Sequence, residues 1–304
     1  MEGTNFQNGV LSRGLPVEGA GTIPMTMYGD QNRYYFVDGR TGIGSDSYDG
    51  LTPDRPFATI AKAITVANAL IGDWSGWGQR TVIVIAPEKY AENLTSLPYG
   101  ATMIGLGDAF DLNGERGVTI KPASGSPVDV TSCINMRIEN ICFESPDTSV
   151  VFQADNFNRN VIKNCVFSGL PGASTTTVKG LETVKDMTGN LIHGCVFQVC
   201  RNGIYVVTDN ANSKQASGNI IEYCYVRGAD QTGMFFHANC VPSYTTINHC
   251  VIGDGSTTLA LGLDDNSGKV MVANTVFEAT ACDPASGDSD SHYNACYLNG
   301  TLMT

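Results

Sequence analysis

Charged side chains are scarce in this sequence. Asp, Glu, Lys and Arg supply 16% of the 304 residues, whereas about a quarter is usual for a globular domain. Basic residues are the rarer sign, with 18 Lys and Arg against 30 Asp and Glu, so the net charge is −12. Nucleic-acid surfaces and anionic lipid both attract clustered Lys and Arg. We therefore expect no nucleic-acid partner, and the acidity is typical of a soluble surface.

Long apolar runs are also missing. The best one, Val-Ile-Val-Ile at residues 82–85, has the length of a β-strand, whereas a membrane-spanning helix needs about 20 residues. Met1 is followed by Glu2, without the basic and apolar regions of a secretory signal peptide. We expect a protein that is made in a cytoplasm and does not insert into a membrane.

Metal and redox motifs are absent although the chain has ten cysteines. No Cys-x-x-Cys pair occurs, and no Cys/His cluster has the spacing of a zinc site. His193 and His249 fall in different columns of the repeat described next, so we expect no two-histidine metal site. We expect no cofactor.

The sequence does contain a repeat, which runs from residue 137 to residue 277. Each unit holds a short apolar segment, then a polar or small residue, and then a position that we expect to be buried. Many units carry a second apolar segment, such as residues 203–207 or 233–236. A unit this small cannot bury its own apolar face, but stacked units can. Read in register, one column of the repeat consists of Ile141, Cys165, Cys195, Cys224, Cys250 and Thr275.

These units predict a parallel β-solenoid over residues 73–280, with roughly 8 coils at the usual strand spacing. The cysteine column is expected to line its interior, because Cys behaves as a small buried hydrophobe. We expect these thiols to stay reduced, since stacked residues have parallel Cβ vectors that suit a disulfide poorly. Insertions at residues 169–189 and 209–218 predict protruding loops.

Different structure is expected at the two ends. Residues 34–72 predict a strand and then an amphipathic helix over residues 56–70, which begins with Pro56 and covers the first coil. Residues 1–33 are rich in Gly and lack periodicity, which indicates an extended arm. Residues 281–304 are expected to form a loop-like tail.

The segment Phe36-Val37-Asp38-Gly39, followed by residues 49–60 and a helix, resembles the entry of pectin-lyase-like proteins. The unit at residues 160–167 is similar to their repeated coil. The resemblance spans residues 34–280 and implies an all-β fold, a single-stranded right-handed parallel β-helix with an N-terminal capping α-helix. It specifies function poorly, since this scaffold hosts lyases, hydrolases, adhesins and phage spikes. Residues 6–16 resemble the opening of short β-helix proteins from tailed bacteriophages, which are regarded as virion components.

The catalytic motifs of the enzymes in this superfold are missing. The polygalacturonase-like hydrolases carry Gly-His-Gly and Arg-x-Lys, whereas this chain has Ile192-His193-Gly194 and no Arg-x-Lys. Asp264 and Asp265 are weak catalytic candidates. Because Asn266-Ser267-Gly268 follows them, we expect both in a turn.

Other candidates for chemistry are similarly weak. Asp46 and Asp49 could bind calcium, but a turn with local Asp hydrogen bonds is favoured. Trp74 and Trp77 could stack on sugars, although capping of the first coil or a subunit interface is favoured.

We therefore expect a structural protein without enzymatic activity, located on the virion surface of a tailed phage and synthesised in the host bacterial cytoplasm. The preferred role is a capsid decoration (cement or head-fibre) subunit, a homotrimer bound to the major capsid protein or to tail proteins. The alternative is a tail fibre or tailspike that binds or degrades a host surface glycan, as a polysaccharide lyase or glycosidase would.

Overall fold

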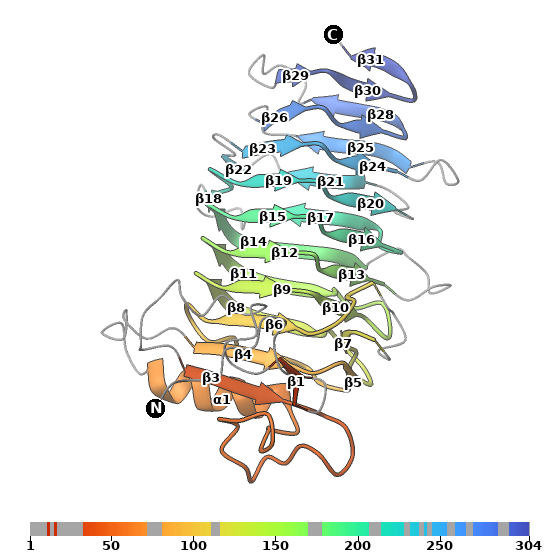
Figure 1. Ribbon diagram of the computed structural model, residues 1–304. Helices are drawn as coiled ribbons and strands as arrows, with labels where there is room; N and C mark the ends of the chain where they lie inside the picture. Colours follow the sequence, from red (N-terminus) through yellow and green to blue (C-terminus); the bar gives the residue numbers. More distant parts are fainter. Residues whose placement is uncertain are drawn as a thin grey trace, which may run out of the picture.

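The chain winds into a solenoid of stacked strands, closed at its N-terminal end by one helix (Figure 1). The structure is a computed structural model. It describes residues 11–12, 15–16, 33–71, 81–110, 116–169, 178–206, 214–227, 232–236, 240–241, 245–253, 259–265, 270–284 and 292–303.

Each coil passes through three sheets in turn, and we name these sheets in that order. The first sheet consists of β3 (Arg33–Val37), β4 (Thr81–Ile85), β6 (Thr102–Gly105), β9 (Arg137–Glu139), β12 (Val161–Lys163), β15 (Leu191–His193), β19 (Ile220–Glu222), β23 (Thr245–Asn248), β26 (Val270–Ala273) and β29 (His292–Asn294). The second consists of β5 (Glu88–Tyr90), β7 (Val118–Ile120), β10 (Ile141–Glu144), β13 (Val166–Ser168), β16 (Val196–Gln198), β20 (Tyr225–Arg227), β24 (Val251–Ile252), β27 (Val276–Phe277), β30 (Cys296–Leu298) and β31 (Thr301–Met303).

The third sheet has longer strands. It consists of β8 (Val128–Ile134), β11 (Phe152–Asn158), β14 (Lys179–Thr188), β17 (Asn202–Val206), β21 (Thr232–Phe236), β25 (Leu259–Asp265) and β28 (Ala279–Pro284). Two short pairs lie outside the three sheets: β1 (Leu11–Ser12) with β2 (Leu15–Pro16), and β18 (Lys214–Gln215) with β22 (Cys240–Val241).

The register of the strands confirms the repeat. Ile162 is aligned with Ile138 in the coil before and with Ile192 in the coil after. Strands of successive coils pair in parallel in all three sheets, and antiparallel pairing occurs in the described residues only for β1–β2 and β30–β31. The predicted all-β fold, a parallel β-helix with an N-terminal helix, is confirmed.

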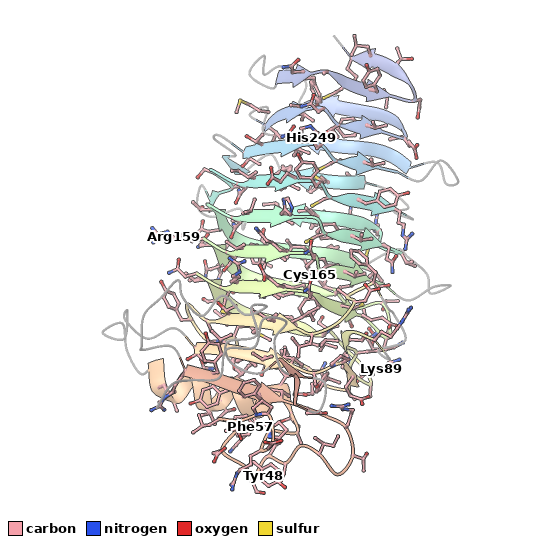
Figure 2. All side chains as sticks on the ribbon, in the orientation of Figure 1. Tyr48, Phe57, Lys89, Arg159, Cys165 and His249 are labelled. Carbon is pink, nitrogen blue, oxygen red and sulfur yellow. The ribbon has the colours of Figure 1, made fainter. Side chains whose placement is uncertain are left out.

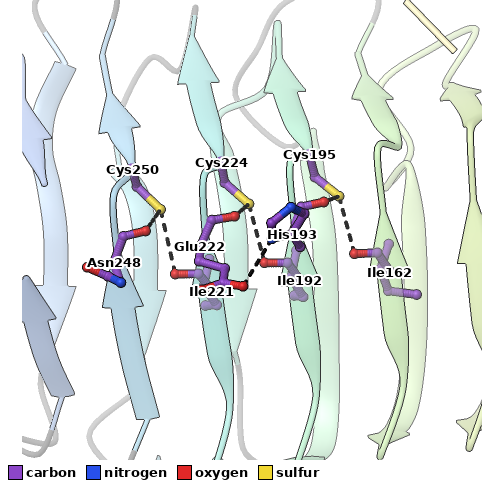
Figure 3. Close-up of polar contacts among 9 residues, drawn as sticks. All are labelled: Ile162, Ile192, His193, Cys195, Ile221, Glu222, Cys224, Asn248 and Cys250. Carbon is purple, nitrogen blue, oxygen red and sulfur yellow. Dashed lines mark hydrogen bonds and ion pairs between the residues drawn. The ribbon is translucent and has the colours of Figure 1, made fainter. Parts of the chain in front are cut away.

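The interior is built from columns of identical or similar side chains. Phe143, Phe167 and Phe197 stack in consecutive coils, with ring centroids 5.6 and 4.8 Å apart. The cysteine column is confirmed as buried, and its thiols are free. The Sγ–H of each cysteine donates to a carbonyl of the preceding coil, as Cys224 does to Ile192 O at 3.6 Å (Figure 3). Burial raises the pKa of Cys195 and Cys224 in this column, and that of Cys200, outside it, to about 12.

From β9 onward, a single left-handed residue turns the chain from the first sheet toward the second. The turn residue has a φ near +50°, the left-handed region that Gly and Asn adopt at little cost. Four of these seven turns follow this rule, and the other three place Tyr, His and Ala there. The turn residues are Asn140, Asn164, Gly194, Tyr223, His249, Asn274 and Ala295.

A second internal column joins the third sheet to the first. Asn160, Asn190 and Asn219 are buried there and bond to one another. The amide N–H of Asn160 donates to Asn190 Oδ1 at 2.9 Å, and Asn190 Nδ2 donates to Phe157 O and to Asn219 Oδ1, each at 2.8 Å. These side chains replace backbone partners that the sharp turn removes.

The capping helix α1 (Ile60–Ile71) starts four residues later than Pro56. The first residue of the helix is determined by two carboxylates from other parts of the chain. Asp46 accepts from the backbone N–H of Thr59 at 3.0 Å, and Glu92 accepts from those of Ile60 and Ala61 at 2.9 and 2.8 Å. The helix buries Ile60, Ala63, Ile64 and Ala67 against the first coils.

The ends of the solenoid also differ from expectation. The tail after residue 280 is not only loop: β28 to β31 extend the sheets, and β31 folds back on β30. The N-terminal arm lies mostly outside the described residues. No described helix has the length and hydropathy to cross a membrane.

Candidate functional site

A column of polar side chains lies along one edge of the second sheet, on its outer face. We call it the polar ladder. The preceding residues, such as Phe143 and Phe197, point into the core, so alternation turns the ladder outward. Strand pairing aligns Glu144, Ser168, Gln198 and Arg227 in four consecutive coils. The ladder consists of Lys121, Glu144, Ser168, Gln198 and Arg227.

Its members hold one another in place. Ser168 Oγ accepts from Gln198 Nε2 at 3.3 Å, and Gln198 Oε1 accepts from Arg227 Nε at 2.9 Å and from Arg227 Nη2. At the other end, Lys121 forms an ion pair with Glu144. Ser168 and Gln198 are buried, whereas Arg227 is exposed, with its guanidinium 5.9 Å from the centre of the Tyr225 ring. An exposed cation is therefore fixed by a buried neutral amide.

The corner beside the polar ladder has a strained backbone. Val199 has a φ of +54°, which is rare for a β-branched residue and costs about 1–2 kcal/mol. Gly169 in the coil below fits against it, because a Cβ there would lie 2.0 Å from Val199 O. Such strain is concentrated at functional sites, so this corner is a candidate for one.

A second group, the aromatic cluster, lies beyond this corner on the third sheet. It consists of Lys179, Glu182, Tyr205 and Phe235. The rings of Tyr205 and Phe235 stack with centroids 4.6 Å apart, and Lys179 Nζ lies 4.2 Å from the centre of the Tyr205 ring. Lys179 also pairs with Glu182, a carboxylate that is 8% exposed. Strand pairing aligns Glu182, Tyr205 and Phe235 in consecutive coils.

The two groups flank the same corner, since β16 ends at Gln198 and β17 begins at Asn202. Together they present the guanidinium of Arg227 and the ion pairs Lys121–Glu144 and Lys179–Glu182 beside stacked rings. This combination is the one that polar ligands with apolar faces require.

Asp264 and Asp265 lie in a strand and not in the expected turn. They are the last two residues of β25, aligned with Phe235 and Phe236. Asp264 therefore occupies the next register position after the aromatic cluster. The turn signal in the sequence begins only after the strand, because the parallel pairing with β21 extends to Asp265.

Asp46 and Asp49 are used by local structure. Asp46 binds the start of α1, and Asp49 accepts from the backbone N–H of Leu51 at 3.1 Å and pairs with Arg55. Within the described chain, no group of three or more His, Cys, Asp or Glu is placed to hold a metal ion. Trp74 and Trp77 lie outside the described residues.

The sequence analysis missed the polar ladder and the aromatic cluster. Ser168, Gln198 and Arg227 are the last residues of β13, β16 and β20, at equivalent positions, so the repeat alignment contained the signal. Lys179 and Glu182 fall within the segment 169–189 that was predicted to be a loop, whereas residues 179–188 form β14.

Comparisons with known proteins bear on the fold. No family model matches the chain, and no curated protein matches it. Solved structures do: a pectin methylesterase in complex with a hexasaccharide (13% identity, TM-score 0.52) and pectin methylesterase PemA from Erwinia chrysanthemi (13% identity, TM-score 0.51). In each case 92% of both chains is covered. The fold is thus a right-handed, pectin-lyase-like parallel β-helix.

The prediction that the protein is not an enzyme is contradicted by these structures. Three solved structures that share its architecture over 92% of the chain are pectin methylesterases. That prediction relied on missing lyase and polygalacturonase motifs. Esterases need neither motif, so the missing motifs are no argument against carbohydrate chemistry on this scaffold.

Proposed function

We propose that this chain binds a polysaccharide along the corner between the polar ladder and the aromatic cluster. The observation that carries the proposal is the fixed Arg227–Gln198–Ser168 chain of hydrogen bonds beside the Tyr205–Phe235 stack. Sugars present hydroxyls to the first group and apolar C–H faces to the second. Two of the structural neighbours are pectin methylesterase complexes with hexasaccharides, which supports an oligosaccharide ligand for this architecture.

The geometry of the polar ladder favours an extended polymer. Its groups repeat once per coil, at about 4.8 Å along the solenoid axis, so a linear glycan parallel to that axis would span from the Lys121–Glu144 pair to the exposed Arg227. Because Gln198 is buried and already bonded, Arg227 loses little side-chain freedom when a ligand arrives. Its unused N–H groups can then donate to sugar oxygens.

The test is binding of the full chain to a panel of neutral and acidic polysaccharides, measured by calorimetry, with product release followed in the same samples. Arg227→Gln should weaken binding about tenfold to a hundredfold, as expected for loss of hydrogen bonds from a charged group. Lys163→Gln removes the same charge from the outer face of the first sheet and should leave the affinity unchanged. Binding of no polysaccharide, or equal effects of the two variants, would refute the proposal.

We further propose that the protein is carried on the surface of a tailed-phage virion. The support is the resemblance of residues 6–16 to phage β-helix proteins. Capsid decoration, with the major capsid protein as partner, is the expected position, and a tail fibre or tailspike is the alternative. Cryo-electron microscopy of particles distinguishes them: density over the capsid lattice or at the tail decides the position, and absence of the chain from particles would exclude both.

A further inference from the structure

A second group of reactive side chains lies on the outer face of the first sheet, beside the turn toward the second sheet. Ile192 and Ile221 are buried, so alternation turns the residues that follow them, His193 and Glu222, outward. Strand pairing aligns these two residues in consecutive coils, and His193 Nδ1 lies 3.0 Å from Glu222 Oε1 (Figure 3). We call this pair the His–Glu dyad.

The His–Glu dyad leaves one imidazole nitrogen ready to take a proton. A carboxylate can only accept a hydrogen bond, so Nδ1 of His193 carries the hydrogen and Nε2 keeps its lone pair. Within the described part of the chain, Nε2 has no hydrogen-bond partner. The side chains of His193 and Glu222 are 34% and 26% exposed, so water reaches the ring. In this arrangement a carboxylate fixes the tautomer of a general base.

Aromatic rings and charges surround His193. Tyr223, which is 54% exposed, meets the imidazole edge-on with centroids 5.3 Å apart, and His249 stacks on Tyr223 at 5.0 Å. Tyr223 and His249 have φ values of +54° and +50°, and such backbone strain is concentrated at functional sites. The titratable or charged groups around the imidazole are Lys163 on β12, Glu222 on β19, Tyr223 and His249 in the next turns and, one coil beyond Lys163, Glu139 with Arg137 on β9.

The turn of the preceding coil supplies a hydrogen-bond donor. The backbone N–H of Asn164 donates to His193 O at 3.0 Å. The exposed side chain of Asn164 lies against Gly194, because a Cβ on Gly194 would lie 2.7 Å from Asn164 Oδ1. Its Nδ2 makes no hydrogen bond with a described residue. A free amide donor thus lies beside the His–Glu dyad, where it can stabilise negative charge on a substrate oxygen.

We propose that this group hydrolyses a carboxylic ester carried by a sugar, with water as the nucleophile. The strands of the first sheet contain no Ser or Cys, and Cys195 beside them is buried, so the base has only water to activate. Glycosidic cleavage needs a second carboxylate at most about 9.5 Å away. In these strands the other carboxylate is Glu139, three coils from Glu222 and thus about 14 Å away. An ester needs only a base and an oxyanion donor.

The reaction balances with these groups and water alone. His193 Nε2 removes a proton from water while the water oxygen bonds to the acyl carbon, and the resulting oxyanion accepts from Asn164 Nδ2. The bond between the acyl carbon and the sugar oxygen then breaks, and that oxygen takes the proton from Nε2. Glu222 stays ionised and stabilises the imidazolium between the two steps. The products are a carboxylic acid and a sugar hydroxyl, and the ring of Tyr223 offers a surface for the apolar face of the sugar.

The experiment uses the full chain with two probes. Hydrolysis of 4-nitrophenyl acetate tests the His–Glu dyad without a sugar, and acetate released from acetylated xylan tests the sugar ester. With 4-nitrophenyl acetate the rate should saturate and exceed that of free imidazole at equal concentration at least about tenfold. His193→Gln should lower kcat about 100-fold or more. Glu222→Gln should lower kcat about tenfold with KM unchanged, whereas Glu139→Gln, a carboxylate of the same column, should leave kcat unchanged.

The pH profile separates a positioning role of Glu222 from a structural one. The rate should rise between about pH 5 and pH 8, as the imidazole loses its proton. In Glu222→Gln the rise should occur at lower pH, because no carboxylate then favours the imidazolium. A rate equal to that of free imidazole, full activity of His193→Gln, or a profile that Glu222→Gln does not move would overturn the proposal.

The sugar part of the substrate rests on the proposed polysaccharide binding, whereas the His–Glu dyad does not. Turnover of 4-nitrophenyl acetate without release of acetate from xylan would overturn the sugar part. If no polysaccharide binds but hydrolysis that depends on His193 persists, the proposed function fails and the catalytic role of the dyad stands. If polysaccharide binds but neither ester is hydrolysed, the ester inference alone fails.

Discussion

Asn190 should be among the most sensitive polar positions of the solenoid. Its side chain is 2% exposed, accepts the N–H of Asn160 and donates to Phe157 O. Asn190→Ala leaves both backbone groups buried without a partner, within the stack of coils whose side chains Figure 2 draws. Each orphaned group costs about 1–3 kcal/mol, so the free energy of unfolding should fall by about 2–6 kcal/mol.

The measurement is urea unfolding at pH 7, followed by circular dichroism of the β signal. Asn294→Ala changes an exposed asparagine in the last coils and should alter stability by less than about 0.5 kcal/mol. Asn190→Asp keeps the acceptor for Asn160 but buries a charge against a carbonyl, so it should be destabilising at pH 7 and recover as acid protonates it. A loss below about 1 kcal/mol for Asn190→Ala would refute the view that this column replaces missing backbone partners.

Three other predictions concern the thiols, the cap and the core. The buried thiols of Cys195 and Cys224 should not react with Ellman's reagent at pH 8 in the folded chain, because burial raises their pKa. They should react once urea unfolds the chain, and rapid reaction without urea would contradict their placement. Burial also raises the pKa of Glu92 above its usual 4.5. The folded state therefore binds the carboxyl proton of Glu92 more tightly than the unfolded chain does. The stability that this binding contributes is present in acid and is lost as the pH rises through the raised pKa. Stability of the unchanged chain relative to Glu92→Gln should therefore fall between pH 4 and pH 7, and an opposite slope in calorimetry would show that the helix amides outweigh burial. Gly50→Ala should cost about 2–3 kcal/mol, since a Cβ there lies 2.2 Å from the buried Phe57 ring at a φ of +69°; an unchanged melting temperature would contradict that packing.

The sequence predicted those parts of the fold that depend on repetition. The column from Ile141 through Cys250 could be aligned from spacing alone, because parallel strands stack in register and place equivalent residues in one environment. The start of α1 could not be predicted, because the carboxylates that bind it come from distant parts of the sequence. Asp46 lies 14 residues before Ile60, and Glu92 lies 32 residues after it.

The candidate site was harder to predict for a related reason. Ser168 and Gln198 look like ordinary turn residues in the sequence, and 30 residues separate them. Their pairing becomes visible only when one coil lies above the next. Asp264 and Asp265 were candidates because they are adjacent in sequence. In a solenoid, however, side chains that lie side by side on one face come from consecutive coils.

The single-residue turn between the first and second sheets has a consequence for how this molecule can vary. In the coils from β9 to β30 that edge keeps one left-handed residue per coil, so its length stays constant there, whereas the connection between β6 and β7 spans residues 106–117. The turn positions along these coils are therefore evenly spaced, about 4.8 Å apart along the solenoid axis. Any residue that tolerates a left-handed backbone can occupy one of these turn positions without shifting the others, as Tyr223 and His249 already do.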